Sequence, residues 1–285
     1  MWQEIIDHLS RLYGEKMPTP QTRLVGGGSI NQTYKLQLGG YVFFVKLNAA
    51  SKMSMLEAEA EALQEIARTQ KIRVPTPIAW GTSQNYAYLV LEWIDLQGAK
   101  DWRALAENLA ALHRVQAKQY GWHRSNTIGE TPQINTWTGN WADFFWQHRI
   151  LYQLKLADRK GFRSPVSWDK LQSRVYELLA NHRTFPSLVH GDLWGGNYGF
   201  DPDGEPVIFD PAAYYGDREV DIAMTELFGG FAPEFYNYYQ QAFPLEPGYQ
   251  QRKTLYNLYH ILNHFNLFGG SYQYQAQQMI SRICQ

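Results

Sequence analysis

The sequence predicts an α+β fold of two lobes, an antiparallel five-stranded sheet with a helix followed by a mainly helical lobe. Between residues 22 and 94, β-branched and aromatic runs alternate with glycine and polar turns, as in a series of hairpins. Beyond Leu96 the apolar residues recur mostly at helical spacing. This change of period divides the chain into lobes at residues 1–94 and 95–285. Of the 285 residues 45% are hydrophobic, which is enough for two packed cores.

Apolar spacing, together with glycine and proline residues that end helices and strands, predicts the individual elements. Apolar residues at helical spacing open the chain, and a glycine-free run rich in strong helix formers lies between the third and fourth strands, where Pro75 and Pro77 then stop it. In chain order we expect a first helix ending near Gly14, three strands between 22 and 45, a helix at 55–68, strands at 78–80 and 86–94, helices around 105–112 and 141–156, and short β segments at 188–190 and 207–209.

Composition narrows the class of protein. The net charge of -1 and the pI near 6.7 leave no basic excess for a run of phosphates, so we expect no nucleic-acid partner. The single cysteine, Cys284, permits no intrachain disulfide, so a cytoplasmic location is expected. No export signal or membrane-spanning apolar run is visible, small molecules fit better as substrates, and we expect a monomer.

The densest group of polar residues is the stretch HGDLWGGN at 190–197, followed by Asp210 at the end of the next apolar strand. The separation of Asp192 and Asn197 equals that in the kinase loop H-R-D-L-x-x-x-N, in which the aspartate accepts a hydroxyl proton and the asparagine binds magnesium. Asp210 then supplies a second magnesium ligand. The alternative is a simple turn and a capped strand end, but the order of these motifs along the chain favours phosphoryl transfer from ATP with Mg²⁺.

A glycine turn lies between the first two predicted strands. Gly27, Gly28 and Ser29 fall in the run GGGSIN, where small residues would let backbone N–H groups approach phosphate. The run is not G-x-G-x-x-G, and a triple glycine can also be a plain hairpin turn. We predict that it contacts the nucleotide because a lysine strand follows.

Lys46 is a single charge in an apolar strand, and such a charge requires an anionic partner when it is half buried. ATP phosphates would supply one, and Glu59 on the following helix would be the ion-pair partner seen in kinases. Glu57 and Glu61 share that helix, and the sequence does not decide which glutamate faces Lys46. The alternative is an exposed lysine on an edge strand.

The last strand of the first lobe ends in Glu92, Trp93 and Ile94. The hinge between the two lobes would lie at this position, next to the adenine base. Its backbone could hydrogen-bond the base whatever the side chains are, although a buried strand end would look the same. We predict that these residues bind the nucleotide.

Taken together, these residues resemble the fructosamine 3-kinase, or ketosamine 3-kinase, family, a branch of the aminoglycoside phosphotransferase and choline kinase-like fold. The resemblance covers nearly the whole chain, with segments in family order. Those segments are GGGSIN, FFVKLN, EAEAEAL, IRVPTPIAWG, LVLEWI, HGDLWGGN and DPAAYYGDREVDIAM.

The resemblance implies a protein kinase-like fold and ATP-dependent phosphorylation of the 3-hydroxyl of ribulosamine, erythrulosamine or fructosamine adducts, which serves deglycation. It implies that Asp221 supports the catalytic loop and that Trp194 and Arg149 lie on the acceptor side. Trp141, Phe144 and Phe145 share a helix with Arg149, where core packing is the simpler expectation. Many eukaryotic relatives carry a cysteine at the position of Ser29, so no redox-linked dimer is expected here.

Two other functions stay open. An aminoglycoside- or choline-type small-molecule kinase would differ only in its acceptor-side residues. A non-catalytic nucleotide-binding module is disfavoured because Lys46, Asp192, Asn197 and Asp210 are all present. A protein kinase is excluded because the stretch between Asp210 and Asp221 has no room for an activation segment.

Overall fold

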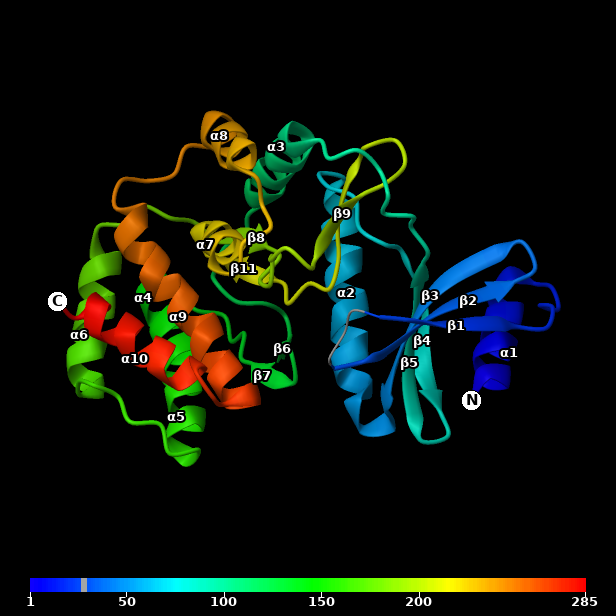
Figure 1. The fold of residues 1–285 in the computed structure, drawn as a ribbon, viewed down its shortest axis with the longest axis horizontal. Coiled ribbons are helices and arrows are strands. Elements are labelled where there is room, and N and C mark those ends of the chain that lie inside the picture. The colour runs from blue at the N-terminus through cyan, green and yellow to red at the C-terminus, as the bar shows by residue number, and fades with distance from the viewer. Residues whose placement is uncertain (27–29) are drawn as a thin grey trace. The chain divides into compact units, whose positions relative to one another are not determined.

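The computed structural model describes residues 1–26 and 30–285 of the chain (Figure 1). These residues form two compact units, each made of two stretches of sequence. The first unit combines Met1–Asp101 with Tyr198–Pro211, and the second combines Trp102–Asn197 with Ala212–Gln285. The first unit therefore contains, besides the predicted first lobe, residues 95–101 and 198–211.

The first unit is built on the predicted five-stranded antiparallel sheet, and this prediction is confirmed. The strand order is β1-β2-β3-β5-β4. The strands are β1 (Gln21–Val25), β2 (Gln32–Leu38), β3 (Tyr41–Ala49), β4 (Pro77–Ser83) and β5 (Tyr86–Glu92). β5 was predicted to reach Ile94 but ends at Glu92, because its pairing with β3 stops at the Phe43–Glu92 pair.

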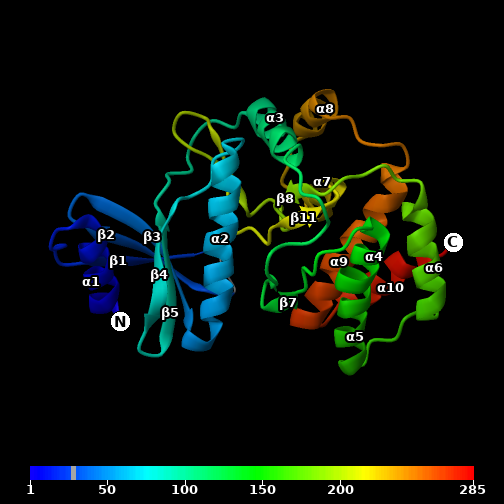
Figure 2. The ribbon, with the colours of Figure 1, turned by 180° about the vertical axis from the view of Figure 1, so that it is seen from behind.

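Two helices cover opposite faces of this sheet, as Figures 1 and 2 show from front and back. They are α1 (Trp2–Tyr13), which ends at a left-handed Gly14, and α2 (Met53–Thr69), which follows the short 3-10 turn η1 (Ala50–Lys52). Alternate residues of β3, namely Phe43, Val45 and Leu47, pack with the buried residues of α1. The alternation turns Lys46 to the other face, where α2 lies.

A hairpin from late in the sequence completes the first unit. It consists of β9 (Tyr198–Phe200) and β10 (Pro206–Ile208). The guanidinium of Arg73 forms ion pairs with Asp201 of the hairpin and with Glu92 (2.9 Å). The Gly98 N–H donates to Phe200 O (3.0 Å), and a Cβ on Gly98 would lie 1.6 Å from Asp201 O. Only glycine fits there, so this contact attaches residues 95–101 to the hairpin.

The second unit is mainly helical, as predicted. Its helices are α3 (Trp102–His113), α4 (Trp141–Phe145), the π-helical turn η2 (Trp146–Ile150), α5 (Leu151–Arg159), α6 (Trp168–Ala180), α7 (Glu219–Leu227), α8 (Pro233–Ala242), α9 (Tyr249–Phe268) and α10 (Tyr272–Ile283). Short strands form two pairs, β6 (Asn126–Ile128) with β7 (Thr131–Gln133) and β8 (Ser187–Val189) with β11 (Tyr214–Gly216). No described helix combines the length and apolar character needed to cross a membrane.

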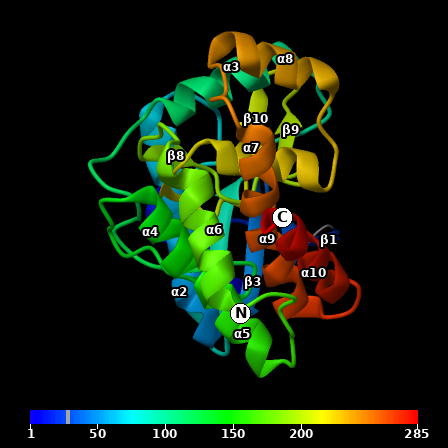
Figure 3. The same cartoon turned by 90° about the vertical axis from the view of Figure 1, so that its left-hand side faces the viewer.

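Helix α9 is the central element of the second unit. It packs against α5, α6, α7 and α10, which surround it in Figure 3, and most of its side chains are buried. One of them is a charge: Arg252 Nε and Nη2 donate to the two carboxylate oxygens of Glu219, each at 2.8 Å. This bidentate pair joins α9 to the start of α7.

We expect Arg252→Leu to lower the free energy of unfolding by about 3–5 kcal/mol, because it leaves the Glu219 carboxylate buried without its partner. Urea denaturation measures the loss. The control is Arg163→Leu, which removes an ion pair to Asp158 (3.3 Å) whose side chains are 76% and 58% exposed. That change should cost at most about 1 kcal/mol. Equal losses in the two variants would contradict the role given to the buried pair.

Candidate active site

The loop from His190 to Asn197 follows β8 directly, and one carboxylate fixes its start. Asp221 on α7 accepts hydrogen bonds from the backbone N–H groups of His190 (2.7 Å) and Gly191 (2.8 Å), one on each oxygen. The Asp192 N–H then donates to His190 Nδ1 (3.2 Å). The residues on both sides of Gly191 therefore have fixed backbone directions.

Asp221 is completely buried, so its charge needs compensation. His113 on α3 contacts Asp221 through Nε2 (3.1 Å) and Tyr239 through Nδ1 (2.7 Å). Burial alone would raise the pKa of Asp221, but the hydrogen bond and electrostatic interaction with His113, the electrostatic interaction with His190 and the hydrogen bond from the Gly191 N–H outweigh it and lower the pKa. The carboxylate stays ionised and continues to accept the two backbone hydrogen bonds from the loop. This position agrees with the supporting role that the sequence predicted for Asp221.

Asp192 and Asn197 lie side by side at the two ends of the loop. The amide nitrogen of Asn197 donates to Asp192 O (2.8 Å) and, at 3.4 Å, to Asp192 Oδ2. The amide oxygen of Asn197 is therefore the atom left to face a cation. Oxygen donors of this kind suit Mg²⁺, so the donor set fits the predicted ligand.

The first unit gathers Lys46, Glu59 and Asp210. Lys46 Nζ donates to Glu59 Oε1 at 2.6 Å and forms a second ion pair with Asp210. The lysine side chain is 3% exposed. Burial alone would lower the pKa of Lys46, but the negative charges of Asp210 and Glu59 outweigh it and hold the pKa above its ordinary value. Of the three glutamates considered on α2, Glu59 is the one paired with Lys46.

Asp210 follows β10 in a left-handed conformation, with φ at 58°. Aspartate tolerates this region better than most residues, but such backbone strain occurs mainly at functional sites. Its side chain is 46% exposed. A strained, accessible carboxylate next to a buried ammonium can bind a cation, as predicted for Asp210.

The predicted hinge residues have unequal surroundings. The Glu92 carboxylate accepts hydrogen bonds from Arg73 and from the Thr76 N–H (3.2 Å) and hydroxyl (3.1 Å), so its side chain serves the fold. Lys35 Nζ lies 4.4 Å from the ring centroid of Trp93. Nucleotide contacts by Glu92, Trp93 and Ile94 stay a prediction.

The glycine turn cannot be compared with the prediction made for it. Gly27, Gly28 and Ser29 lie outside the described residues. Their contact with the nucleotide stays a prediction.

Comparison with known proteins identifies the family. The sequence model of the fructosamine kinase family matches residues 1–285. The chain belongs to the fructosamine kinase family. A probable ketoamine kinase of Synechocystis is 53% identical over 286 residues, which cover 99% of this chain and 96% of the relative. A chloroplastic protein-ribulosamine 3-kinase of Oryza sativa is 42% identical over 90% of this chain and 76% of the relative. The crystal structure of a candidate fructosamine-3-kinase from Haemophilus somnus matches with a TM-score of 0.93 and 34% identity, covering 99% of this chain and 97% of that one.

The two predicted acceptor-side residues of this fructosamine kinase family member differ in exposure. Trp194 is 39% exposed in the catalytic loop, and a Cβ on Gly196 would lie 2.4 Å from its ring. The edge of the indole ring therefore lies over Gly196, and part of the side chain is exposed. Arg149 has no exposed surface: its guanidinium lies 4.1 Å from the Tyr214 ring and donates to Ile134 O (2.7 Å). In this conformation Arg149 can act only through the residues that it contacts. The helical spacing in the sequence did not indicate how deeply its side chain is buried.

The aromatic residues near Arg149 are core residues, as the sequence suggested. Trp141, Phe144 and Phe145 are all buried on α4. The predicted helix at 141–156 is present as α4, η2 and α5 in succession.

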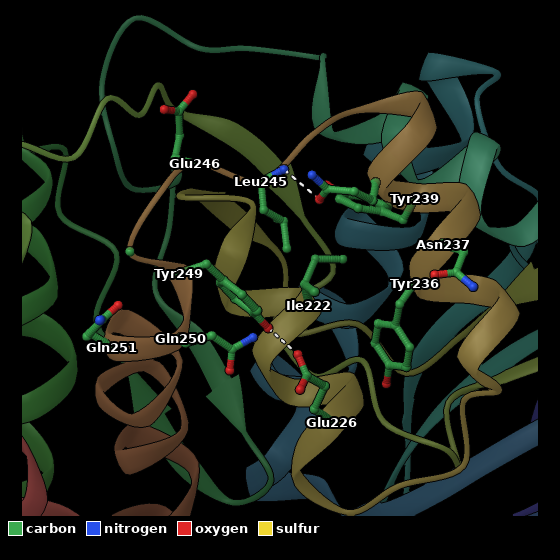
Figure 4. A pocket seen from close by; sticks show the side chains of 12 residues that line it. Ile222, Glu226, Tyr236, Asn237, Tyr239, Leu245, Glu246, Tyr249, Gln250 and Gln251 are labelled. Carbon is green, nitrogen blue, oxygen red and sulfur yellow. Dashed lines mark hydrogen bonds between the residues drawn. The ribbon is translucent and has the colours of Figure 1, made fainter.

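A pocket of about 570 Å³ lies between α7, α8 and the start of α9 (Figure 4). Over the described residues, its lining contains none of the predicted site residues. The Tyr249 hydroxyl donates to Glu226 Oε1 (2.5 Å), and Lys253 Nζ lies 2.6 Å from Glu226 Oε2. The carboxylate on the pocket wall is thus already paired.

A second polar group is buried near the start of α7. His182, Asp217 and Glu219 lie close enough together to share a metal ion, and within the described chain this is the one group of histidine, cysteine or acidic side chains that does so. Glu219 is bound by Arg252, and Asp217 accepts a hydrogen bond from the Tyr256 hydroxyl (2.5 Å). These internal partners compensate the carboxylates, so we assign the group to the structure of the fold.

We expect Gly191→Ala to abolish most activity and to destabilise the protein more than Gly204→Ala does. Both glycines have positive φ, 81° and 85°, which costs a side chain about 1–2 kcal/mol. A Cβ on Gly191 would also lie 2.2 Å from Ala212 O, whereas one on Gly204 has its nearest neighbour at 3.5 Å. Urea unfolding and turnover of both variants test this. Equal stability and turnover in the two would show that the loop tolerates the clash.

Proposed function

We propose that this chain is an ATP-dependent ketosamine 3-kinase that phosphorylates the 3-hydroxyl of ribulosamine, erythrulosamine or fructosamine adducts and so supports protein deglycation. The observation that carries the proposal is the pairing of Asp192 with Asn197 in a loop whose backbone Asp221 holds. Membership of the fructosamine kinase family gives this pair a substrate class. An aminoglycoside- or choline-type acceptor is the alternative.

Asp192 is the proposed general base. It accepts the proton of the acceptor hydroxyl while that oxygen forms a bond to the γ-phosphorus and the bond from phosphorus to the ADP oxygen breaks. Asn197 fixes Asp192 through its amide nitrogen and offers its amide oxygen to magnesium. When bound, Mg²⁺ neutralises the charge of the phosphates, and Asp210 is its second proposed ligand.

Lys46 is the proposed phosphate-binding residue. Its ammonium charge is secured by Glu59, so it can bind a phosphate oxygen without first changing its protonation. Gly27, Gly28 and Ser29 and the hinge at Glu92, Trp93 and Ile94 are proposed to bind the rest of the nucleotide. Residues 1–94 would then serve mainly nucleotide binding and residues 95–285 mainly catalysis and acceptor binding.

The acceptor is proposed to stack on the indole ring of Trp194, which is 39% exposed, since such a ring is a suitable platform for a sugar. The rice relative is named for ribulosamine, and we propose the same sugar as the preferred one here. Arg149 would contribute only through the residues it contacts. A cytoplasmic monomer without a redox-linked dimer is proposed from the single Cys284 and from Ser29 in the glycine turn.

The first test is ADP release from ATP and magnesium with ribulosamine, erythrulosamine and fructosamine conjugates of lysine, beside aminoglycosides and choline. We expect selective turnover of the ketosamines, fastest with ribulosamine. Selective turnover of an aminoglycoside or of choline would replace the substrate class and keep the mechanism. ATP binding with no turnover of any acceptor would instead favour a non-catalytic nucleotide-binding module.

Two variants separate the base from the metal ligand. Asp192→Asn should retain ATP binding and lose turnover by about 10²- to 10⁴-fold, because only the base is removed. Asp210→Ala should also weaken magnesium-dependent ATP binding, because a metal ligand is lost. Calorimetry beside kinetics measures both effects, and wild-type turnover in Asp192→Asn would rule out that residue as the base.

A further inference from the structure

Three buried side-chain amides lie behind the catalytic loop in the second unit. They are Asn126 and Gln133, which face each other across the β6–β7 hairpin, and Asn135 just beyond it. We call them the amide cluster. Each is at most 8% exposed, and buried amides are retained only where their hydrogen bonds are satisfied.

The amide cluster holds two consecutive backbone carbonyls. Gln133 Nε2 donates to Ala212 O (2.9 Å) and to Asn126 Oδ1 (2.8 Å), while Asn126 Nδ2 donates to Ala213 O (2.9 Å). Asn135 Nδ2 adds a second hydrogen bond to Asn126 Oδ1 (2.8 Å). These hydrogen bonds fix the orientation of the Asn126 and Gln133 amides, and they thereby fix the backbone path of residues 212–213.

Two large side chains anchor the amide cluster from behind. The Tyr259 hydroxyl donates to Gln133 Oε1 (2.7 Å), and Arg149 Nη2 donates to Asn135 Oδ1 (2.8 Å). Burial raises the pKa of Tyr259; Arg149 opposes the rise, and the negative charge of Asp192 adds to it. The phenol keeps its proton and stays a donor to Gln133. This also gives the buried Arg149 a defined task.

The other side of residue 212 meets the catalytic loop. The Ala212 N–H donates to His190 O (2.9 Å), and the Ala212 carbonyl lies so close to Gly191 that no side chain fits between them. Along the chain, Ala212 comes two residues after Asp210, and His190 comes two residues before Asp192. Ala212 thus contacts the start of the loop that carries the proposed base and lies two residues from the proposed metal ligand.

We propose that the amide cluster is a positioning device for phosphoryl transfer, with Gln133 as its central residue. Gln133 orients the Ala212 carbonyl, and Ala212 orients the loop that carries Asp192. Amides suit this task because they fix direction, as apolar packing would not, and because they add no charge beside a general base. The role rests on the kinase activity proposed above.

Gln133→Leu and Asn126→Leu should lower kcat by about 10- to 100-fold, as expected when support behind an active site is lost. The KM for ATP should change little, because Lys46 and Glu59 belong to the other unit. Hydrogen exchange at the Ala212 amide should accelerate in both variants. This second measurement needs no acceptor substrate.

The matched control is Asn266→Leu. Asn266 is also buried, 4% exposed, and its amide donates to Gln153 O (3.0 Å) and Oε1 (2.7 Å), so it reaches the amide cluster only indirectly, through the hydrogen bond between Gln153 and Tyr259. It should lose stability like Asn126→Leu but keep the wild-type kcat per folded molecule and the wild-type exchange rate at Ala212. Similar losses of kcat in Asn126→Leu and Asn266→Leu would show that the amide cluster contributes only to stability and does not position the catalytic loop.

Gln133→Glu adds a pH signature and covers the case in which the leucine variants do not fold. An ionised carboxylate at position 133 cannot donate to Ala212 O, whereas a protonated carboxyl can, and burial beside carbonyl oxygens raises the pKa of such a carboxyl. The kcat of this variant relative to wild type should therefore rise as the pH falls. A constant ratio together with wild-type exchange at Ala212 would overturn the inference. If the wild-type protein did not turn over ketosamines, the proposed function would be refuted. Hydrogen exchange at the Ala212 amide would then still test whether Gln133 orients Ala212.

Discussion

The candidate active site depends on one buried carboxylate, that of Asp221. Its two oxygens bind two adjacent backbone N–H groups, and a buried charge cannot be left without such partners. His113 and Tyr239 complete its surroundings. Asp221 thus holds the start of the loop through its backbone. Asp221, in the first turn of α7, therefore ties this helix to the start of the loop.

The two units keep buried charges in different ways. In the first unit Lys46 lies between two carboxylates, so the cation is secured while Asp210 stays accessible. In the second unit Arg252 neutralises Glu219 inside the helical core. The first arrangement leaves an unbalanced negative charge that a divalent cation can satisfy. The second leaves none, which agrees with a structural role.

Sequence patterns predicted what repeats locally or matches a spaced motif. Alternation predicted the sheet, and the separation of Asp192 and Asn197 predicted their pairing. The division at residues 94 and 95 did not anticipate that the hairpin at 198–211 belongs to the first unit, because Arg73 and Gly98 contact it across a long sequence separation. Asn126 and Gln133 lie on three-residue strands, which are too short for alternation to be visible. The burial of Arg149 was equally hidden, since helical spacing indicates a face and not a depth.

The division of the first unit into two stretches of sequence has a consequence for biosynthesis. Domains fold as units while the chain is made from its N-terminus. The sheet and its two helices leave the ribosome early, but β9, β10 and Asp210 follow only after the whole first stretch of the second unit. Until then Arg73 lacks Asp201, and Lys46 has Glu59 but not Asp210. The second ion pair of Lys46 is therefore formed late, so a nascent chain interrupted before residue 210 carries a sheet with an unfinished site.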